Sequence, residues 1–302
     1  MKTLITSVSD FITQLDKRSL AIISLPLAFL VLLNYHLRLE ENILRISTFP
    51  LRFIAAYVLY VFVFCGALFV MLWHRGQVNL LKNRFILLLF LSAPVLFAWR
   101  VTSGYLLSFD GAIYQKYVAI IANPPLKCVV LFFFLYMVRK AGRYDYHLSG
   151  LGNGKVDYKP FFGLLLLASP FIFFFASTPG FLEAYPRLQR VNFMLEKSSS
   201  PWLSAIVYEL SYAFDFLFVE AYFRGFLVLA FLRYCGTASI LPMAALYCAI
   251  HFGKPAVECI SSFFGGVLLG VVAYHTRSIM PGLILHLGIG WMMELAALYW
   301  GS

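Results

Sequence analysis

The sequence predicts an all-α, polytopic transmembrane helical bundle with about eight to ten spans. Hydrophobic residues make up 61% of the 302 residues and charged residues 13%, whereas soluble domains average about 45–50% apolar and about 25% charged residues. Apolar runs approaching the roughly 20 residues that cross a bilayer recur along the chain. Continuous runs of this kind favour helices over barrel strands, which alternate in polarity over about ten residues.

The candidate spans are apolar segments separated by short polar or basic joints. They lie approximately at residues 19–34, 52–73, 84–100, 118–138, 160–178, 202–233, 238–252, 256–274 and 279–299. The segment 202–233 is too long for one upright span. We therefore expect it to be strongly tilted, broken near Gly225, or composed of two elements.

No soluble domain fits the sequence. The longest polar segments, about 139–159 and 179–200, are each too short to bury a core of their own, so we expect connecting loops there. Residues 1–200 are expected to form N-terminal transmembrane helices and basic loops of unassigned role. Residues 201–302 are expected to form a transmembrane core that carries the polar site.

The net charge of +10 is explained by membrane topology rather than by binding to nucleic acid. Basic residues such as Lys17, Arg75 and Arg139 lie at alternate joints, a pattern that predicts a cytoplasmic N-terminus; Arg45 and Arg187 lie at the opposite joints, so the bias is modest. The first apolar run lacks the features of a cleavable signal peptide. We expect an integral protein of a bacterial inner membrane.

Ionisable residues are concentrated in the last third of the chain. Those within or beside apolar helices are Glu209, Asp215, Glu220, Arg224, His251, Glu258, His286 and Glu294. A charge at bilayer depth costs at least about 2.5–3.5 kcal/mol on insertion scales. Such groups are therefore expected to pair, to face a cavity, or to serve a reaction.

Three of the acidic residues have an assignable helical position. Glu220 precedes Arg224 by four residues, so the two share a helix face, either as a simple ion pair or as part of a site. Asp215 points elsewhere on the same helix. Glu258 falls in the first turn of a later helix, where the helix dipole favours an anion by about 0.3–1 kcal/mol.

Two histidines lie at apolar helices. His251 ends one of them, four residues after Tyr247, and could be either a core histidine or a site residue. His286 is surrounded by aliphatic residues. Glu294 lies eight positions later, close to the same face of that helix, so the two predict a polar stripe.

Taken together, Glu220, Arg224, His251 and His286 suit an acid–base site that activates water. The histidines could complete the base, donate to an oxyanion, or bind a divalent metal such as zinc together with Glu220. The sequence leaves these alternatives open. It indicates no other cofactor.

The spacing of these residues resembles a known pattern. Glu-Glu-x-x-x-Arg is followed by an aromatic residue four positions before a histidine, and then by a histidine four positions before Asn or Asp. Over about residues 205–299 this chain is similar to the CPBP or Abi intramembrane proteases, which include the CAAX-type prenyl endopeptidases. The resemblance implies hydrolysis of a membrane-embedded or lipid-anchored peptide, with Glu220 and a histidine activating water.

Two positions depart from that pattern in their chemistry, and Tyr247 in place of Phe is a third, minor departure. Alignment on Arg224 puts Val219 where the first glutamate belongs, and Glu220 then takes the second position, about 100° away around the helix. Gly290 replaces the final Asn or Asp, which removes a side-chain oxyanion donor. We expect Glu220 to have taken over the missing role, helped by Glu258 or Glu294.

Two other functions compete with the hydrolase. A catalytically inactive relative would bind a membrane partner or confer immunity to a peptide toxin. A solute transporter would use the same charges as a proton or ion path. Against transport, the ionisable residues occupy one end of the chain, and its first half shows no matching pair of broken, charged helices.

Overall fold

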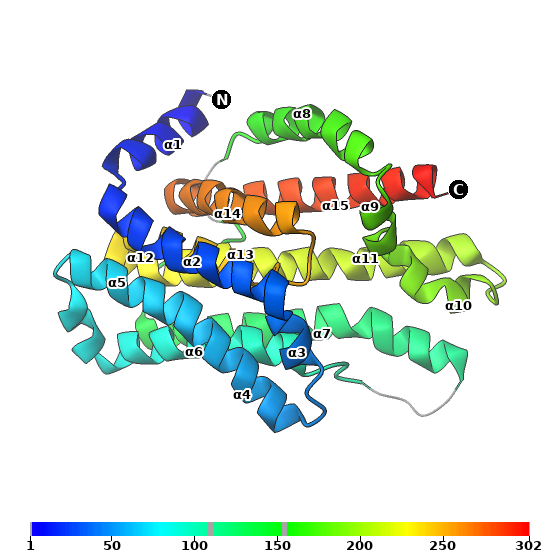
Figure 1. Cartoon of the computed structure of the whole chain (residues 1–302), viewed down its shortest axis with the longest axis horizontal. Helices are drawn as coiled ribbons and strands as arrows, with labels where there is room; N and C mark the ends of the chain where they lie inside the picture. Colours follow the sequence, from blue (N-terminus) through cyan, green and yellow to red (C-terminus); the bar gives the residue numbers. More distant parts are fainter. Residues whose placement is uncertain (1, 108–111, 153–155, 302) are drawn as a thin grey trace.

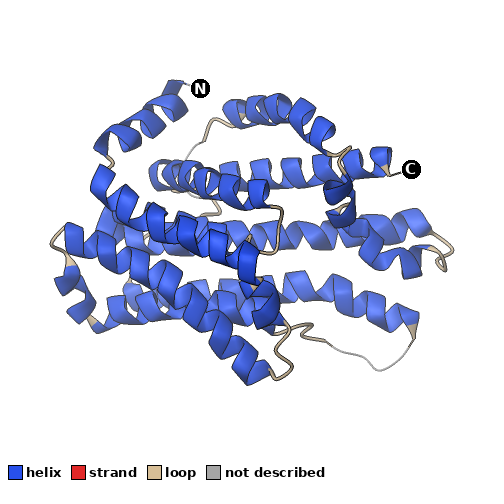
Figure 2. Ribbon diagram, in the orientation of Figure 1, coloured by secondary structure: helices blue, strands red, loops and turns tan. Residues whose placement is uncertain are grey.

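The computed structural model describes residues 2–107, 112–152 and 156–301, and within these ranges it contains helices and no strands (Figure 2). Seven helices of the described ranges are long and apolar enough to cross a membrane. An eighth span is added if the bent pair Lys159–Phe175 and Pro179–Leu195 counts as one. The predicted all-α polytopic bundle is confirmed, and with that pair the number of spans reaches the predicted range.

Two long helices in the first half of the chain begin at side-chain caps. Asp16 accepts hydrogen bonds from the backbone N–H groups of Arg18 and Ser19, and Asn83 caps a later helix in the same way. The helices of this half are α1 (Lys2–Gln14), α2 (Lys17–Leu37), α3 (Leu39–Leu44), α4 (Phe49–Tyr60), α5 (Gly66–His74), α6 (Arg84–Thr102) and α7 (Ile113–Gly142), with a π-helical turn at Val61–Cys65 and a 3₁₀ turn at Val78–Lys82.

The second half brings the remaining helices alongside the first. They are α8 (Lys159–Phe175), α9 (Pro179–Ala184), α10 (Asn192–Leu195), α11 (Pro201–Glu220), α12 (Phe231–Cys235), α13 (Ile240–Ala249), α14 (Ala256–Thr276) and α15 (Met280–Trp300), with 3₁₀ turns at Arg187–Val191 and Gly236–Ser239. Figure 1 shows α11 and α13 between α14 and α15 on one side and α6 and α7 on the other.

The long apolar segment after residue 201 changes its helical geometry near Gly225. Regular α-helix ends at Glu220, and a wider π-helix, η4, follows over Ala221–Ala230. The predicted spans 202–233 and 238–252 therefore belong to one helical stretch, Pro201–Ala249, in which Gly236 adopts a positive φ of 55°. π-Helical insertions are frequent at functional sites.

Residues of η4 lie at the centre of the molecule. All ten are buried, and they pack in one core with α2, α4, α6, α7 and α13. The core therefore includes helices from both sides of residue 200. The predicted division of roles between residues 1–200 and 201–302 stays a prediction.

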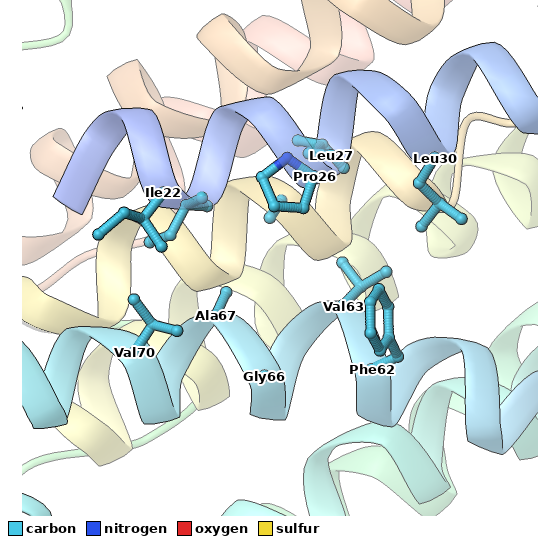
Figure 3. A pocket seen from close by; sticks show the side chains of 11 residues that line it. Ile22, Pro26, Leu27, Leu30, Phe62, Val63, Gly66, Ala67 and Val70 are labelled. Carbon is cyan, nitrogen blue, oxygen red and sulfur yellow. The ribbon is translucent and has the colours of Figure 1, made fainter. Parts of the chain in front are cut away.

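A cavity of about 220 Å³ lies between α2 and the α4–α5 region (Figure 3). Its lining is apolar and includes Pro26, Phe62 and Gly66. Because none of the lining side chains ionises, this cavity lacks the groups for acid–base chemistry.

Gly225 provides a test of this packing. A Cβ atom there would overlap the carbonyl oxygen of Leu148, a backbone atom that cannot move aside easily. We expect Gly225→Ala to destabilise the fold by about 1–3 kcal/mol, as overpacking does, measured as a lower melting temperature in detergent. Gly163→Ala is the matched control, since its Cβ would meet nothing within 4 Å; equal melting of the two variants would contradict the packing.

Candidate active site

Glu220 and Arg224 form a buried ion pair at the junction of α11 and η4. The Glu220 Oε1 and an Arg224 guanidinium nitrogen lie 3.0 Å apart, and the two side chains are 0% and 1% exposed. The guanidinium carbon also lies 4.4 Å from the ring centroid of Tyr247, which is cation–π distance. The predicted helix-face pairing is therefore present, and it lies entirely inside the protein.

His286 joins this pair to Tyr247. Its Nδ1 lies 2.5 Å from Glu220 Oε1, and its Nε2 lies 2.6 Å from the Tyr247 hydroxyl oxygen. The Glu220 contacts have ion-pair distances with angles outside strict hydrogen-bond geometry. Because an ionised carboxylate only accepts, we assign the ring proton to Nδ1, which leaves Nε2 to accept from Tyr247.

Gly282 makes room for this arrangement. A Cβ atom at Gly282 would overlap Glu220 Oε2, so the glycine at the start of α15 allows the carboxylate to approach the helix backbone. Gly282 lies in the first turn of α15. Its contact with Glu220 depends on the packing of α15 against α11.

His251 lies in the loop between α13 and α14. Its Nδ1 is 2.7 Å from the backbone carbonyl oxygen of Tyr247; since that oxygen can only accept, Nδ1 carries the proton. The pKa of His251 is lowered to about 4, chiefly by burial; the hydrogen bond to the Tyr247 carbonyl raises it, and the nearby charge of Lys254 lowers it. The ring is therefore neutral at physiological pH, with an unprotonated Nε2.

Both imidazoles line one cavity of about 590 Å³. Tyr247 and Val219 line it as well, whereas Glu220 is not part of the lining and reaches the cavity through His286. Charged side chains also face it: Arg100, Arg187, Arg190, Asp215, Lys254 and Glu258. The cavity thus combines two imidazoles with a lining in which basic groups outnumber acidic ones.

Residues 199–292 match the family model of type II CAAX prenyl endopeptidases, Rce1-like. This match confirms the resemblance drawn from the motifs. The matched segment, the CAAX-like region, contains Glu220, Arg224, His251 and His286 and covers the last third of the chain. Comparison with curated proteins and with solved structures gives no significant match.

The two departures within the CAAX-like region have clear structural settings. Val219 lines the same cavity as both imidazoles, so the position of the missing glutamate presents an apolar side chain to that cavity. At Gly290, a Cβ atom would lie 2.5 Å from the ring carbon Cζ of Phe216. The Phe216 ring therefore lies where a larger side chain at position 290 would begin.

The other predicted supporting acids have different positions. Glu258 lines the cavity and pairs with Lys254 at 3.4 Å. Glu294 is 4% exposed, and its carboxylate accepts the backbone N–H groups of Arg187 and Leu188 at 2.8 and 3.2 Å. Glu294 therefore binds the start of the 3₁₀ turn Arg187–Val191, and its carboxylate is directed to that turn and not to the imidazoles.

Sequence reasoning missed the pair formed by Arg100 and Asp215. Their side chains meet at 2.7 Å and both line the cavity. Asp215 precedes Val219 by four residues, so its helix face could have been assigned from spacing. Arg100 comes from α6, more than a hundred residues earlier, and no local pattern connects it with Asp215.

The hypothesised metal ligands are not arranged as a ligand set. In residues 2–107, 112–152 and 156–301, no group of three or more His, Cys, Asp or Glu side chains is placed to hold a metal ion. Glu220 Oε1 faces the Nδ1 of His286 and the guanidinium of Arg224. Glu220, His251 and His286 therefore do not have the arrangement of a zinc site.

The depressed pKa of His251 predicts a particular response to pH. The ordinary pKa of histidine is 6.5, and that of His251 in the folded protein is about 4. Between these two pH values the unfolded chain binds a proton at His251 that the folded chain does not bind. The stability contributed by the neutral His251 ring is therefore full above about pH 6.5 and is lost as the pH falls towards 4. Nitrogen NMR of ¹⁵N-histidine protein should show a neutral Nδ1–H ring at pH 5.5, assigned with His251→Asn. A ring that titrates above pH 6 would disprove the assignment.

Proposed function

We propose that the protein is an intramembrane endopeptidase that hydrolyses a peptide bond of a membrane-embedded or lipid-anchored substrate. The match of residues 199–292 supports this activity at the level of the family. The observation that carries the proposal is the chain of contacts from Glu220 through His286 to Tyr247, which ends in the cavity that His251 also lines.

In the proposed reaction, His251 is the general base. Its unprotonated Nε2 takes a proton from water as the water oxygen adds to the peptide carbonyl carbon, and the proton then passes to the leaving amine nitrogen. General base catalysis of this kind contributes about 10²–10⁴-fold. The Tyr247 hydroxyl, which donates to His286 Nε2 in the absence of substrate, turns its proton to the carbonyl oxygen as negative charge develops there.

In this scheme Glu220 does not contact the substrate and acts through His286. Its carboxylate holds the Nδ1–H of His286 and thereby sets the tautomer and orientation of that ring, as the aspartate does in Ser-His-Asp triads. Arg224 neutralises the buried carboxylate. An acid at position 220 can therefore contribute without lining the cavity.

A catalytically inactive membrane protein is the second candidate, acting through a binding partner or in immunity to a peptide toxin. The apolar Val219 in the cavity and the Phe216 ring against Gly290 favour it. Both candidates place the chain in a membrane. A bacterial inner membrane and a cytoplasmic N-terminus stay predictions from the charge pattern.

Single substitutions separate the two candidates. We expect His251→Ala and His286→Ala each to lower cleavage of a prenylated CAAX peptide by at least about 100-fold, because each removes part of the acid–base pathway. Glu220→Gln should also lower it by disturbing the His286 tautomer. Proteoliposome cleavage is measured with His36→Ala as the control, since His36 is exposed on α2. Full activity of all three variants would refute the proposed hydrolase.

Val219→Glu tests the apolar position directly. A carboxylate there would line the cavity together with His251, so we expect cleavage to rise about tenfold or more, since a positioned general base contributes up to about 10²–10⁴-fold. Val219→Gln has similar size without the charge and should give no rise. If the wild type cleaves nothing while Val219→Glu does, the inactive candidate is correct.

A further inference from the structure

The loop that carries His251 is short and only partly held by its own hydrogen bonds. Within it, the backbone N–H of His251 donates to Cys248, that of Phe252 to Ala249, and that of Lys254 to His251. The carbonyl groups of Phe252 and Lys254 find their partners outside the loop. Buried backbone groups require partners, so whatever supplies them determines where the loop lies.

Asn34, near the end of α2, supplies the first of these partners. It is 3% exposed, and its amide Nδ2 donates to the carbonyl oxygen of Phe252 at 2.9 Å. Its Oδ1 accepts the backbone N–H of Glu40 at 3.1 Å. One buried side chain thus joins the residue after His251 to the turn between α2 and α3.

Tyr35 and Glu40 complete the contact. The Tyr35 hydroxyl donates to the carbonyl oxygen of Lys254 at 2.6 Å. The Glu40 carboxylate lies against Gly253, where a Cβ atom would be 2.6 Å from Glu40 Oε2. Residues 34–40 join the end of α2 to the start of α3 and are called the α2–α3 turn. Three consecutive loop residues, Phe252, Gly253 and Lys254, therefore each contact a side chain of this turn.

We propose that the α2–α3 turn is a positioning element for His251, and that Asn34, Tyr35 and Glu40 are its positioning residues. This inference rests on the proposed function, in which His251 is the base. The turn lies outside the CAAX-like region and about 218 residues from the loop in sequence. It makes the N-terminal helices part of the working site.

The physical reason is the precision that proton transfer requires. The Tyr247 carbonyl restrains the His251 ring, but the backbone on its C-terminal side is held by the α2–α3 turn. A displacement of about 1 Å at a reacting group can cost about 100-fold in rate. Since none of the three residues lines the cavity, they can act only through the loop.

The first arm of the experiment measures the loop without any substrate. Amide hydrogen exchange of wild-type protein in lipid nanodiscs is compared with Asn34→Ala, Tyr35→Phe and the control His36→Ala, whose side chain is exposed and follows them on α2. We expect exchange in the peptide covering residues 250–255 to rise at least about fivefold in the first two variants. Unchanged exchange in both would overturn the proposal.

The second arm measures catalysis with the prenylated CAAX peptide in proteoliposomes. Asn34→Asp keeps the side-chain shape but loses the donor to Phe252, and we expect its kcat to fall at least tenfold with KM within about twofold. Glu40→Gln is compared with Glu41→Gln, whose carboxylate pairs with exposed Arg45. A raised KM with unchanged kcat in Asn34→Asp would contradict a positioning role.

The two arms fail independently. If wild-type protein cleaves nothing while loop exchange rises in Asn34→Ala and Tyr35→Phe, the proposed hydrolase is refuted and the structural link stands. If wild-type protein cleaves the peptide and neither exchange nor kcat responds to the substitutions, the positioning element is refuted and the hydrolase stands.

Discussion

The buried ion pair of Glu220 and Arg224 is the constraint on which the rest of the site depends. Removing one partner of such a pair typically costs about 3–5 kcal/mol, because the other charge is left buried alone. The pair lies where α11 passes into the π-helix η4. Arg224 lies under the ring of Tyr247 from α13, and Glu220 lies against Gly282 from α15, so three helical segments meet at this pair. His286 shares the same carboxylate, so the ion pair also determines where that imidazole lies.

The two departures from the protease pattern acquire meaning from this geometry. Val219 places an apolar side chain in the cavity, and in the proposed reaction Glu220 acts through the tautomer of His286 instead. Gly290 admits the ring of Phe216, whose centroid lies 6.1 Å from that of His286. At these two positions the site is thus more apolar and more aromatic than one with two glutamates and an asparagine.

The N-terminal helices do more than anchor the chain. α6 contributes Arg100 to the cavity, where it pairs with Asp215, and the α2–α3 turn holds the loop of His251. The family match covers only the chain from just before α11 to residue 292 within α15. A catalytic unit defined by that match alone would lack the partners of three consecutive loop residues, because those partners belong to helices that precede it.

The sequence by itself determined the all-helical membrane class, the pairing of Glu220 with Arg224, and the motifs of His251 and His286, because hydropathy and helical period are local properties of the chain. Tertiary structure alone decided that Glu220 faces His286 rather than the cavity, that Phe216 lies against Gly290, and that Asn34 meets Phe252. The physical reason is that these contacts arise where helices distant in sequence pack together, and no spacing within one helix encodes which neighbour it will meet.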